Sequence, residues 1–159
     1  MRRKDREVTD IGQIKEVLDG CKTCRLAMVD RGKPYLIPLN YAYIINDKTL
    51  TLYFHSAKEG RKIRVLSEDS NVCYEISAEG RAIFPETAPC DSGYYYSSVI
   101  GSGDAQFITE MNEKCSALAL LMKQQVNIDV AFTPAQAENV CIIKVVSTDF
   151  TCKIKPQAL

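Results

Sequence analysis

The sequence predicts a mainly β protein, an antiparallel barrel with helices inserted between some of its strands. Three observations lead to this prediction. About six segments have the alternating or continuously apolar pattern of strands. Turn signals join most of these segments directly. Only a few connections have the length and period of a helix, whereas a parallel doubly wound sheet needs a helix after nearly every strand.

The predicted strands differ mainly in how turns and prolines limit them. In chain order they cover residues 24–29, 35–45, 49–55, 72–77, 94–108 and 140–146. Pro38 removes a ladder donor, so we expect it at a bulge or on a sheet edge. Residues 78–93, rich in Gly and Pro, are expected to form the longest loop. Gly101-Ser102-Gly103 predicts a bulge inside the fifth strand.

Each predicted helix begins at a residue that can cap it. The expected caps are Thr9 or Asp10, Ser56, Thr109 and Thr133. The first helix ends at Gly20, and the longest covers residues 110–125. The last is a short helix whose Pro134 stands at the first helical position.

Length and charge limit the function classes. The 159 residues are 46% hydrophobic, so we expect residues 1–159 to form one domain with its own core. Twenty basic and twenty acidic residues cancel, so no global field favours nucleic acid or an anionic membrane as partner. The longest apolar run, residues 117–122, is far shorter than the ~20 residues that span a bilayer. No apolar signal-peptide core follows Met1–Lys4, and we expect a cytoplasmic protein.

The cysteines do not suggest a disulfide framework, because their number, seven, is odd and their spacing is irregular. Cys21 and Cys24 form a single CxxC motif, which is typical of a redox pair or of half a zinc site. Zinc would need a second pair or a nearby histidine, and the only histidine is His55. No metal is therefore expected. Two small buried cysteines are the preferred explanation of the motif, because Cys24 is expected to be the first residue of a strand.

The junction after the third predicted strand points to an anion. Ser56 followed by Glu59 has the spacing of a capping box. Lys58, Arg61 and Lys62 then lie on one helical face, close to the positive end of the helix dipole. Three cations repel one another there, and an anion bound among them and the first-turn amides would relieve the repulsion. A well-capped, solvated surface helix is the alternative.

Five segments carry a recognisable order of motifs. They are Met1–Glu7, Cys24-Arg25-Leu26, Pro34–Tyr41, Leu52–Lys62 and Tyr96–Gly103. Together they resemble the nitroimidazole-resistance (Nim) family, which belongs to the pyridoxamine 5′-phosphate oxidase-like FMN-binding split barrels. The most specific part is the His55-Ser56-Ala57 block followed by Gly60-Arg61-Lys62.

The resemblance implies a six-stranded antiparallel Greek-key split β-barrel, a homodimer, and FMN bound at the dimer interface. The residues that it implies for cofactor binding are Pro38, Leu39, Asn40, Tyr41, His55, Ser56, Ala57, Lys58, Arg61, Lys62, Ser97, Ser98 and Val99. Ser56, Arg61 and Lys62 would hold the phosphate, and residues 38–41 would line the isoalloxazine. Residues 97–99 would reach the cofactor from a neighbouring strand or from the other subunit.

By this resemblance the protein is expected to be an FMN-dependent reductase of small electrophiles, similar to a nitroimidazole reductase. His55 is the candidate catalytic residue, because histidine is the side chain whose ordinary pKa suits proton delivery near neutrality. A strand-end histidine with a local hydrogen bond is the alternative. Vitamin B6 oxidation is not expected, because the chain has no Trp and lacks the Trp- and Arg-rich C-terminal substrate motif. A non-catalytic flavin carrier, or the same barrel binding haem or a deazaflavin, remain alternatives.

Overall fold

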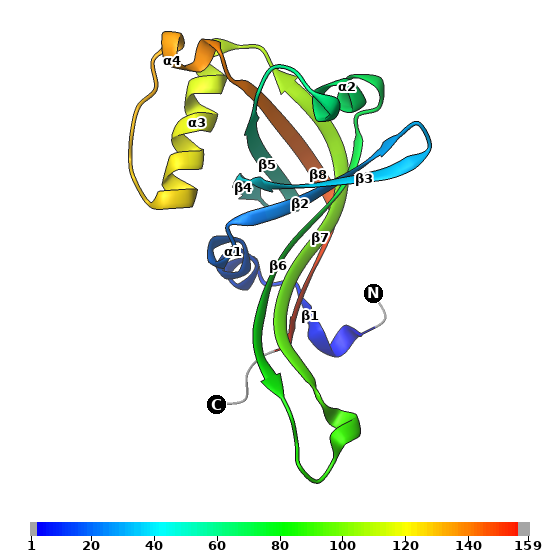
Figure 1. The fold of residues 1–159 in the computed structure, drawn as a ribbon. Coiled ribbons are helices and arrows are strands. Elements are labelled where there is room, and N and C mark those ends of the chain that lie inside the picture. The colour runs from blue at the N-terminus through cyan, green and yellow to red at the C-terminus, as the bar shows by residue number, and fades with distance from the viewer. Residues whose placement is uncertain (1–2, 156–159) are drawn as a thin grey trace.

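The computed structural model describes residues 3–155 and shows an antiparallel sheet that curls into a barrel, with helices at its ends and side (Figure 1). The strands are β1 (Glu7–Val8), β2 (Thr23–Asp30), β3 (Lys33–Asn40), β4 (Ala42–Asn46), β5 (Thr49–Ser56), β6 (Asn71–Ile83), β7 (Gly93–Ile108) and β8 (Cys141–Lys155). The helices are α1 (Ile11–Gly20), α2 (Arg61–Glu68), α3 (Met111–Val126) and α4 (Pro134–Glu138), with short 3-10 turns at Lys4–Arg6 and Pro89–Asp91. Met1 and Arg2 of the motif Met1–Glu7, and residues 156–159, lie outside the described residues.

The predicted mainly β class with inserted helices is confirmed, but the strand number is wrong. The described residues form an eight-stranded sheet in the order β3-β2-β6-β7-β8-β5-β4, with β1 paired to β8. The predicted strand over residues 35–45 breaks at Tyr41, whose ring is fully buried and whose hydroxyl donates to the Leu18 carbonyl at 2.6 Å. The short β1 adds the eighth strand.

The predicted long loop over residues 78–93 is partly strand, and the loop itself is shorter than predicted. β6 continues to Ile83 and β7 begins at Gly93, so the two strands form a long hairpin that extends away from the barrel (Figure 1). The predicted bulge at Gly101–Gly103 is confirmed, since the pairing of β7 with β8 shifts between Ser102 and Asp104. A side chain at Gly103 would collide with the Val146 carbonyl, so only glycine fits there.

The edge position expected for Pro38 is also confirmed. β3 is the last strand at one end of the sheet, and its Pro38 pairs with Arg25 of β2. No strand lies on the other side of β3, so the N–H that proline lacks is not needed there for a sheet hydrogen bond.

Two of the four predicted helix caps are confirmed. Asp10 caps α1 by accepting from the Gln13 amide, and Thr133 forms the capping box of α4 with Gln136. At α3 the cap is Glu110 and not Thr109, because the Glu110 carboxylate accepts the Glu113 amide at 2.7 Å.

Two apolar clusters hold the elements together. The larger one fills the barrel between the sheet, α1 and α2, and includes Leu52 and Phe54 of β5. The smaller one packs α3 and α4 against the outer side of the sheet through Leu118, Leu121 and Ile142. β5 therefore lies between both clusters, and its side chains alternate between them. Within residues 3–155, no helix is long and apolar enough to cross a membrane.

Candidate functional site

The junction between β5 and α2 differs from the predicted capping box. Ser56 is the last residue of β5, where it continues the buried face of the strand and pairs with Cys141 of β8. α2 begins four residues after the expected place, and its N-cap is Gly60, whose φ of 125° is a conformation that glycine tolerates. Glu59 therefore makes no capping box with Ser56, and that prediction is wrong.

The junction nevertheless has two features that favour an anion. Ser56 is 9% exposed, and its Oγ is the one buried side-chain polar atom among the described residues that lacks a hydrogen-bond partner. No side chain caps α2, so its first-turn amides have no side-chain acceptor at the positive end of the helix dipole. A phosphate could accept from the hydroxyl and from these amides.

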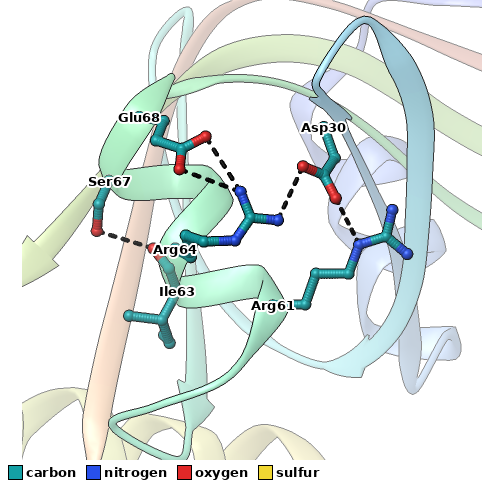
Figure 2. Close-up of polar contacts among 6 residues, drawn as sticks. All are labelled: Asp30, Arg61, Ile63, Arg64, Ser67 and Glu68. Atoms are coloured by element: carbon teal, nitrogen blue, oxygen red, sulfur yellow. Dashed lines mark hydrogen bonds and ion pairs between the residues drawn. The ribbon is translucent and has the colours of Figure 1, made fainter.

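Arg61 is held in place from two directions. Its Nε donates to Asp30 Oδ2 at 2.7 Å (Figure 2). Its guanidinium lies 4.1 Å from the centre of the Tyr35 ring. The two Nη atoms of Arg61 make no hydrogen bond with the described residues, so its fork can still engage phosphate oxygens.

Asp30 is the shared acceptor of this side of α2. It is 8% exposed and also accepts from Arg64 Nη2 at 2.8 Å, while Arg64 Nη1 donates to Glu68 at 3.1 Å (Figure 2). Hydrogen bonds from Arg64 and Arg61 lower the pKa of the Asp30 carboxyl, so it stays ionised. Sequence reasoning missed Asp30, because its place before Arg31-Gly32 indicates only a hairpin turn.

The other side of α2 carries cations without carboxylate partners. Neither Lys58 nor Lys62 forms an ion pair with any residue in the described range. Burial lowers the pKa of Lys62, while the nearby Cys141 opposes that shift. Lys114 of α3 acts on the same thiol, is 7% exposed, and donates to the Glu138 carbonyl at 3.4 Å.

His55 points to the opposite face of β5 from Ser56. It lines a cavity of about 410 Å³ beneath α3 together with Asn40, and apolar side chains make up most of the remaining wall. Those other lining residues are Leu118, Leu121, Met122, Gln125, Val126 and Phe132. One histidine and two amides in a mostly apolar cavity are typical of a small-molecule site.

Gln125 organises the polar end of this cavity and was missed by sequence reasoning. Its Nε2 donates to the Tyr41 carbonyl at 2.7 Å, and its Oε1 accepts from Asn40 Nδ2 at 3.1 Å. The sequence places Gln125 only at the end of a helix. Of the predicted ring-lining residues, Tyr41 has its ring in the core, Leu39 packs against that core, and Pro38 is exposed on the edge strand. Tyr41 is fully buried as a whole residue, so its side chain does not line a ligand site.

The structure brings some predicted site residues together and separates others. His55 and Asn40 share the cavity, while Ser56, exposed Ala57 and Lys58, and residues 61–62 surround the start of α2. Ser97, Ser98 and Val99 lie elsewhere. Val99 is near the far end of β8, paired with Cys152, whereas Ser56 is paired with Cys141 at the beginning of β8. One chain therefore does not bring residues 97–99 to the start of α2.

Comparison with protein families gives one match. The family model described as pyridoxamine 5′-phosphate oxidase matches residues 10–151. A search of curated proteins finds no significant relative.

Several solved structures are similar to this one. A candidate 5-nitroimidazole antibiotic resistance protein from Bacteroides thetaiotaomicron VPI-5482 is 29% identical, with a TM-score of 0.79 over 93% of this chain and 86% of that one. The flavocytochrome Anf3 from Azotobacter vinelandii is 17% identical, with a TM-score of 0.81 over 99% and 72%. An FAD and heme binding protein from Mycobacterium smegmatis is 16% identical, with a TM-score of 0.79 over 97% and 77%. The last two likenesses show the fold alone, that of the split barrels.

Proposed function

Since this chain belongs to the pyridoxamine 5′-phosphate oxidase-like family, we propose that it binds FMN and reduces small electrophiles in the manner of a nitroimidazole reductase. The family binds flavins and includes flavin-dependent oxidoreductases. The single observation that carries the proposal is the unpartnered Ser56 hydroxyl beside an uncapped helix start and free cations. The likeness to the 5-nitroimidazole resistance protein supports the choice of acceptor.

The FMN phosphate would be held by Ser56, Arg61 and Lys62, with Lys58 nearby. The Ser56 hydroxyl would donate the hydrogen bond that it lacks within the protein. Asp30 and Tyr35 already orient the Arg61 guanidinium, so little side-chain entropy is lost when its Nη atoms engage the anion.

The isoalloxazine would lie against residues 38–41, with Asn40 and His55 at the shared cavity. β3 is an edge strand, so its open side leaves main-chain groups near Pro38 available to the polar rim of the ring. Gln125 holds Asn40 and the Tyr41 carbonyl in fixed positions from α3.

We propose that a second copy of the chain supplies Ser97, Ser98 and Val99. Within one chain these residues lie toward the opposite end of β8 from Ser56, in the part of the β6–β7 hairpin that also pairs with β8, and the Val99 side chain is fully buried in the larger core cluster. A homodimer that places this hairpin against the α2 end of its partner would complete the cofactor site.

When bound, the flavin would supply the redox chemistry. The chain would bind and orient it, and the apolar wall under α3 would exclude water from the acceptor. His55 would deliver a proton to the acceptor as it is reduced, because its imidazole is the one acid–base side chain among the described residues that line the cavity.

The absorbance spectrum of the freshly purified protein tests the cofactor. Flavin bands that bleach when NADH or NADPH and a nitroaromatic acceptor are added support the proposal. Flavin bands that do not bleach with any reductant indicate a carrier, a Soret band indicates haem, and a colourless protein that takes up no FMN contradicts it. In the same assay, we expect His55→Ala to keep FMN but to reduce the acceptor roughly 100-fold more slowly.

A further inference from the structure

Cys141 lies opposite Ser56 in the ladder of β5 and β8. Side chains of directly opposed residues share one face of a sheet, with Cβ atoms about 4.5–5.5 Å apart. Ser56 is nine-tenths buried and its Oγ has no partner, while the Cys141 side chain is only partly buried. A thiol that solvent can reach therefore stands beside a hydroxyl that is free to bind a ligand.

The charges around this thiol are all positive. Lys114, Lys62 and Lys58, in decreasing order, favour its thiolate form against the burial that raises its pKa. They come from three segments, namely α3, the first turn of α2, and the turn after β5. No carboxylate of the described chain acts on the thiol, so the field at this point attracts anions.

Other cysteines of the barrel lack this combination. Cys152 is buried in the core, and burial alone raises its pKa to about 11. Cys24 is also buried, and burial together with the nearby Glu75 raises its pKa further. Cys73 and Cys90 are exposed. Cys141 alone among these five is partly accessible and surrounded by lysines.

We propose that Cys141 is a modification site for anionic low-molecular-weight disulfides, and that its modification and phosphate binding at Ser56 exclude one another. In the reaction the Cys141 thiol loses its proton to solvent, and the thiolate attacks one sulfur of the disulfide. A new S–S bond joins Cys141 to that half, the original S–S bond breaks, and the other half leaves as a thiolate. The disulfide is the oxidant, and no other co-reactant is needed.

The choice of an anionic disulfide follows from the lysines, which raise the local concentration of anions and so the rate of attack. The exclusion follows from the shared space, because a group attached to Cys141 would occupy the side of the sheet toward which Ser56 points. The exclusion of FMN in particular rests on the proposed function, whereas the preference for anionic disulfides does not.

The test compares two disulfide reagents on the purified protein after any flavin has been removed. One is the dianionic 5,5′-dithiobis(2-nitrobenzoate), and the other is the neutral 2,2′-dithiodipyridine. Peptide mass spectrometry follows each cysteine separately, with exposed Cys73 as the internal reference. For each cysteine we compare the rate of modification by the anionic reagent with the rate by the neutral one. We expect this ratio to be roughly 10-fold higher at Cys141 than at Cys73, and to fall at Cys141 when salt is added.

Two variants examine the origin of the preference. Lys114→Met and the exposed Lys58→Met should each lower the ratio at Cys141 and leave the ratio at Cys73 unchanged. The second variant keeps the test valid if replacement of the buried Lys114 prevents folding. Equal ratios at Cys141 and Cys73 in the parent protein would overturn the proposal.

The exclusion is tested by adding FMN, or inorganic phosphate alone, before the anionic reagent. Slower modification of Cys141, with Cys73 unaffected, supports the proposal. FMN that binds without slowing Cys141 would overturn the exclusion and leave the proposed function standing. Protection by inorganic phosphate in a protein that takes up no FMN would support the site at Cys141 and contradict the proposed function.

Discussion

The two sides of helix α2 differ in whether their cationic side chains form ion pairs. Toward the β2–β3 hairpin, the buried Asp30 carboxylate forms ion pairs with both Arg61 and Arg64, and Arg64 also pairs with Glu68 (Figure 2). Toward β8, Lys62 and the preceding Lys58 lie near Cys141 and form no ion pair with the described residues. The same helix thus has a side whose charges are balanced within the fold and a side whose charges are left for a ligand.

This difference separates structural charge from binding charge. A paired cation lowers the free energy of the folded state, whereas neighbouring cations without partners raise it slightly until an anion binds. Arg61 belongs to both sides, because Asp30 holds its Nε while its two Nη atoms remain available. We infer that the paired side positions Arg61 and the unpaired side supplies most of the attraction for phosphate.

The largest expected effect comes from removing cations at the start of α2. Charged hydrogen bonds contribute about 1.5–3 kcal/mol each, so Arg61→Met with Lys62→Met should weaken FMN binding roughly 100-fold or more. Titration calorimetry with the flavin-free protein measures the change. The matched control is Lys15→Met, an exposed lysine of α1, which should bind FMN like the parent. An unchanged affinity in the double variant would contradict the phosphate assignment.

A smaller effect on binding is expected when the paired side is broken. Asp30→Asn removes the charge that orients Arg61 and Arg64, so we expect FMN binding to weaken about tenfold, the lower end of what loss of an orienting partner costs. The melting temperature should also fall by several degrees, because two arginines lose a buried acceptor.

Glu68→Gln is the matched control for that variant, since it removes the exposed carboxylate of the same network. It should change the melting temperature much less and leave FMN affinity unaltered, because Arg61 does not contact Glu68. If Asp30→Asn lowered stability but left FMN affinity at the parental value, Asp30 would be purely structural and Arg61 would not need it.

The parts of the fold that could be predicted from the sequence are those that depend on residues close together in the chain. The alternation of β5, the glycine bulge in β7 and the capping box of α4 depend on neighbouring residues, and all were predicted correctly. The break at Tyr41 was not predicted, because an apolar strand pattern continues through it. What ends β3 is a contact with the Leu18 carbonyl of α1, which is distant in sequence.

The site follows the same rule. The basic segment after His55 was recognisable, but Ser56 and Glu59 matched a capping pattern that the structure does not use. The alternation of β5 itself could have placed Ser56 inside the barrel, since Leu52 and Phe54 are buried on that face. The partners Asp30, Gln125 and Cys141 reach the site through tertiary pairing of strands and helices, and nothing local to them in the sequence indicates this.

The smallest expected effect is the pH dependence of the paired side. Hydrogen bonds from Arg64 and Arg61 lower the pKa of Asp30 in the folded protein, so its contribution to stability is present above the pKa of the unfolded chain, about 3.9. That contribution is lost as the pH falls through the lower, folded-state pKa. The Asp30→Asn variant has no ionisable group at this position, so its stability does not depend on pH through residue 30. The gap in unfolding free energy between parent and variant should therefore be constant from pH 7 to about pH 5 and narrow as the pH falls below about 4.

Urea unfolding of both proteins across this range measures the gap. The same series with Glu68→Gln should show a small gap that hardly changes with pH, because the exposed carboxylate gains little from its pairing with Arg64. A parent-to-Asp30→Asn gap that widened in acid would mean that Asp30 is held protonated in the folded protein. In that case the two sides of α2 would not differ in the way that the ion pairs indicate.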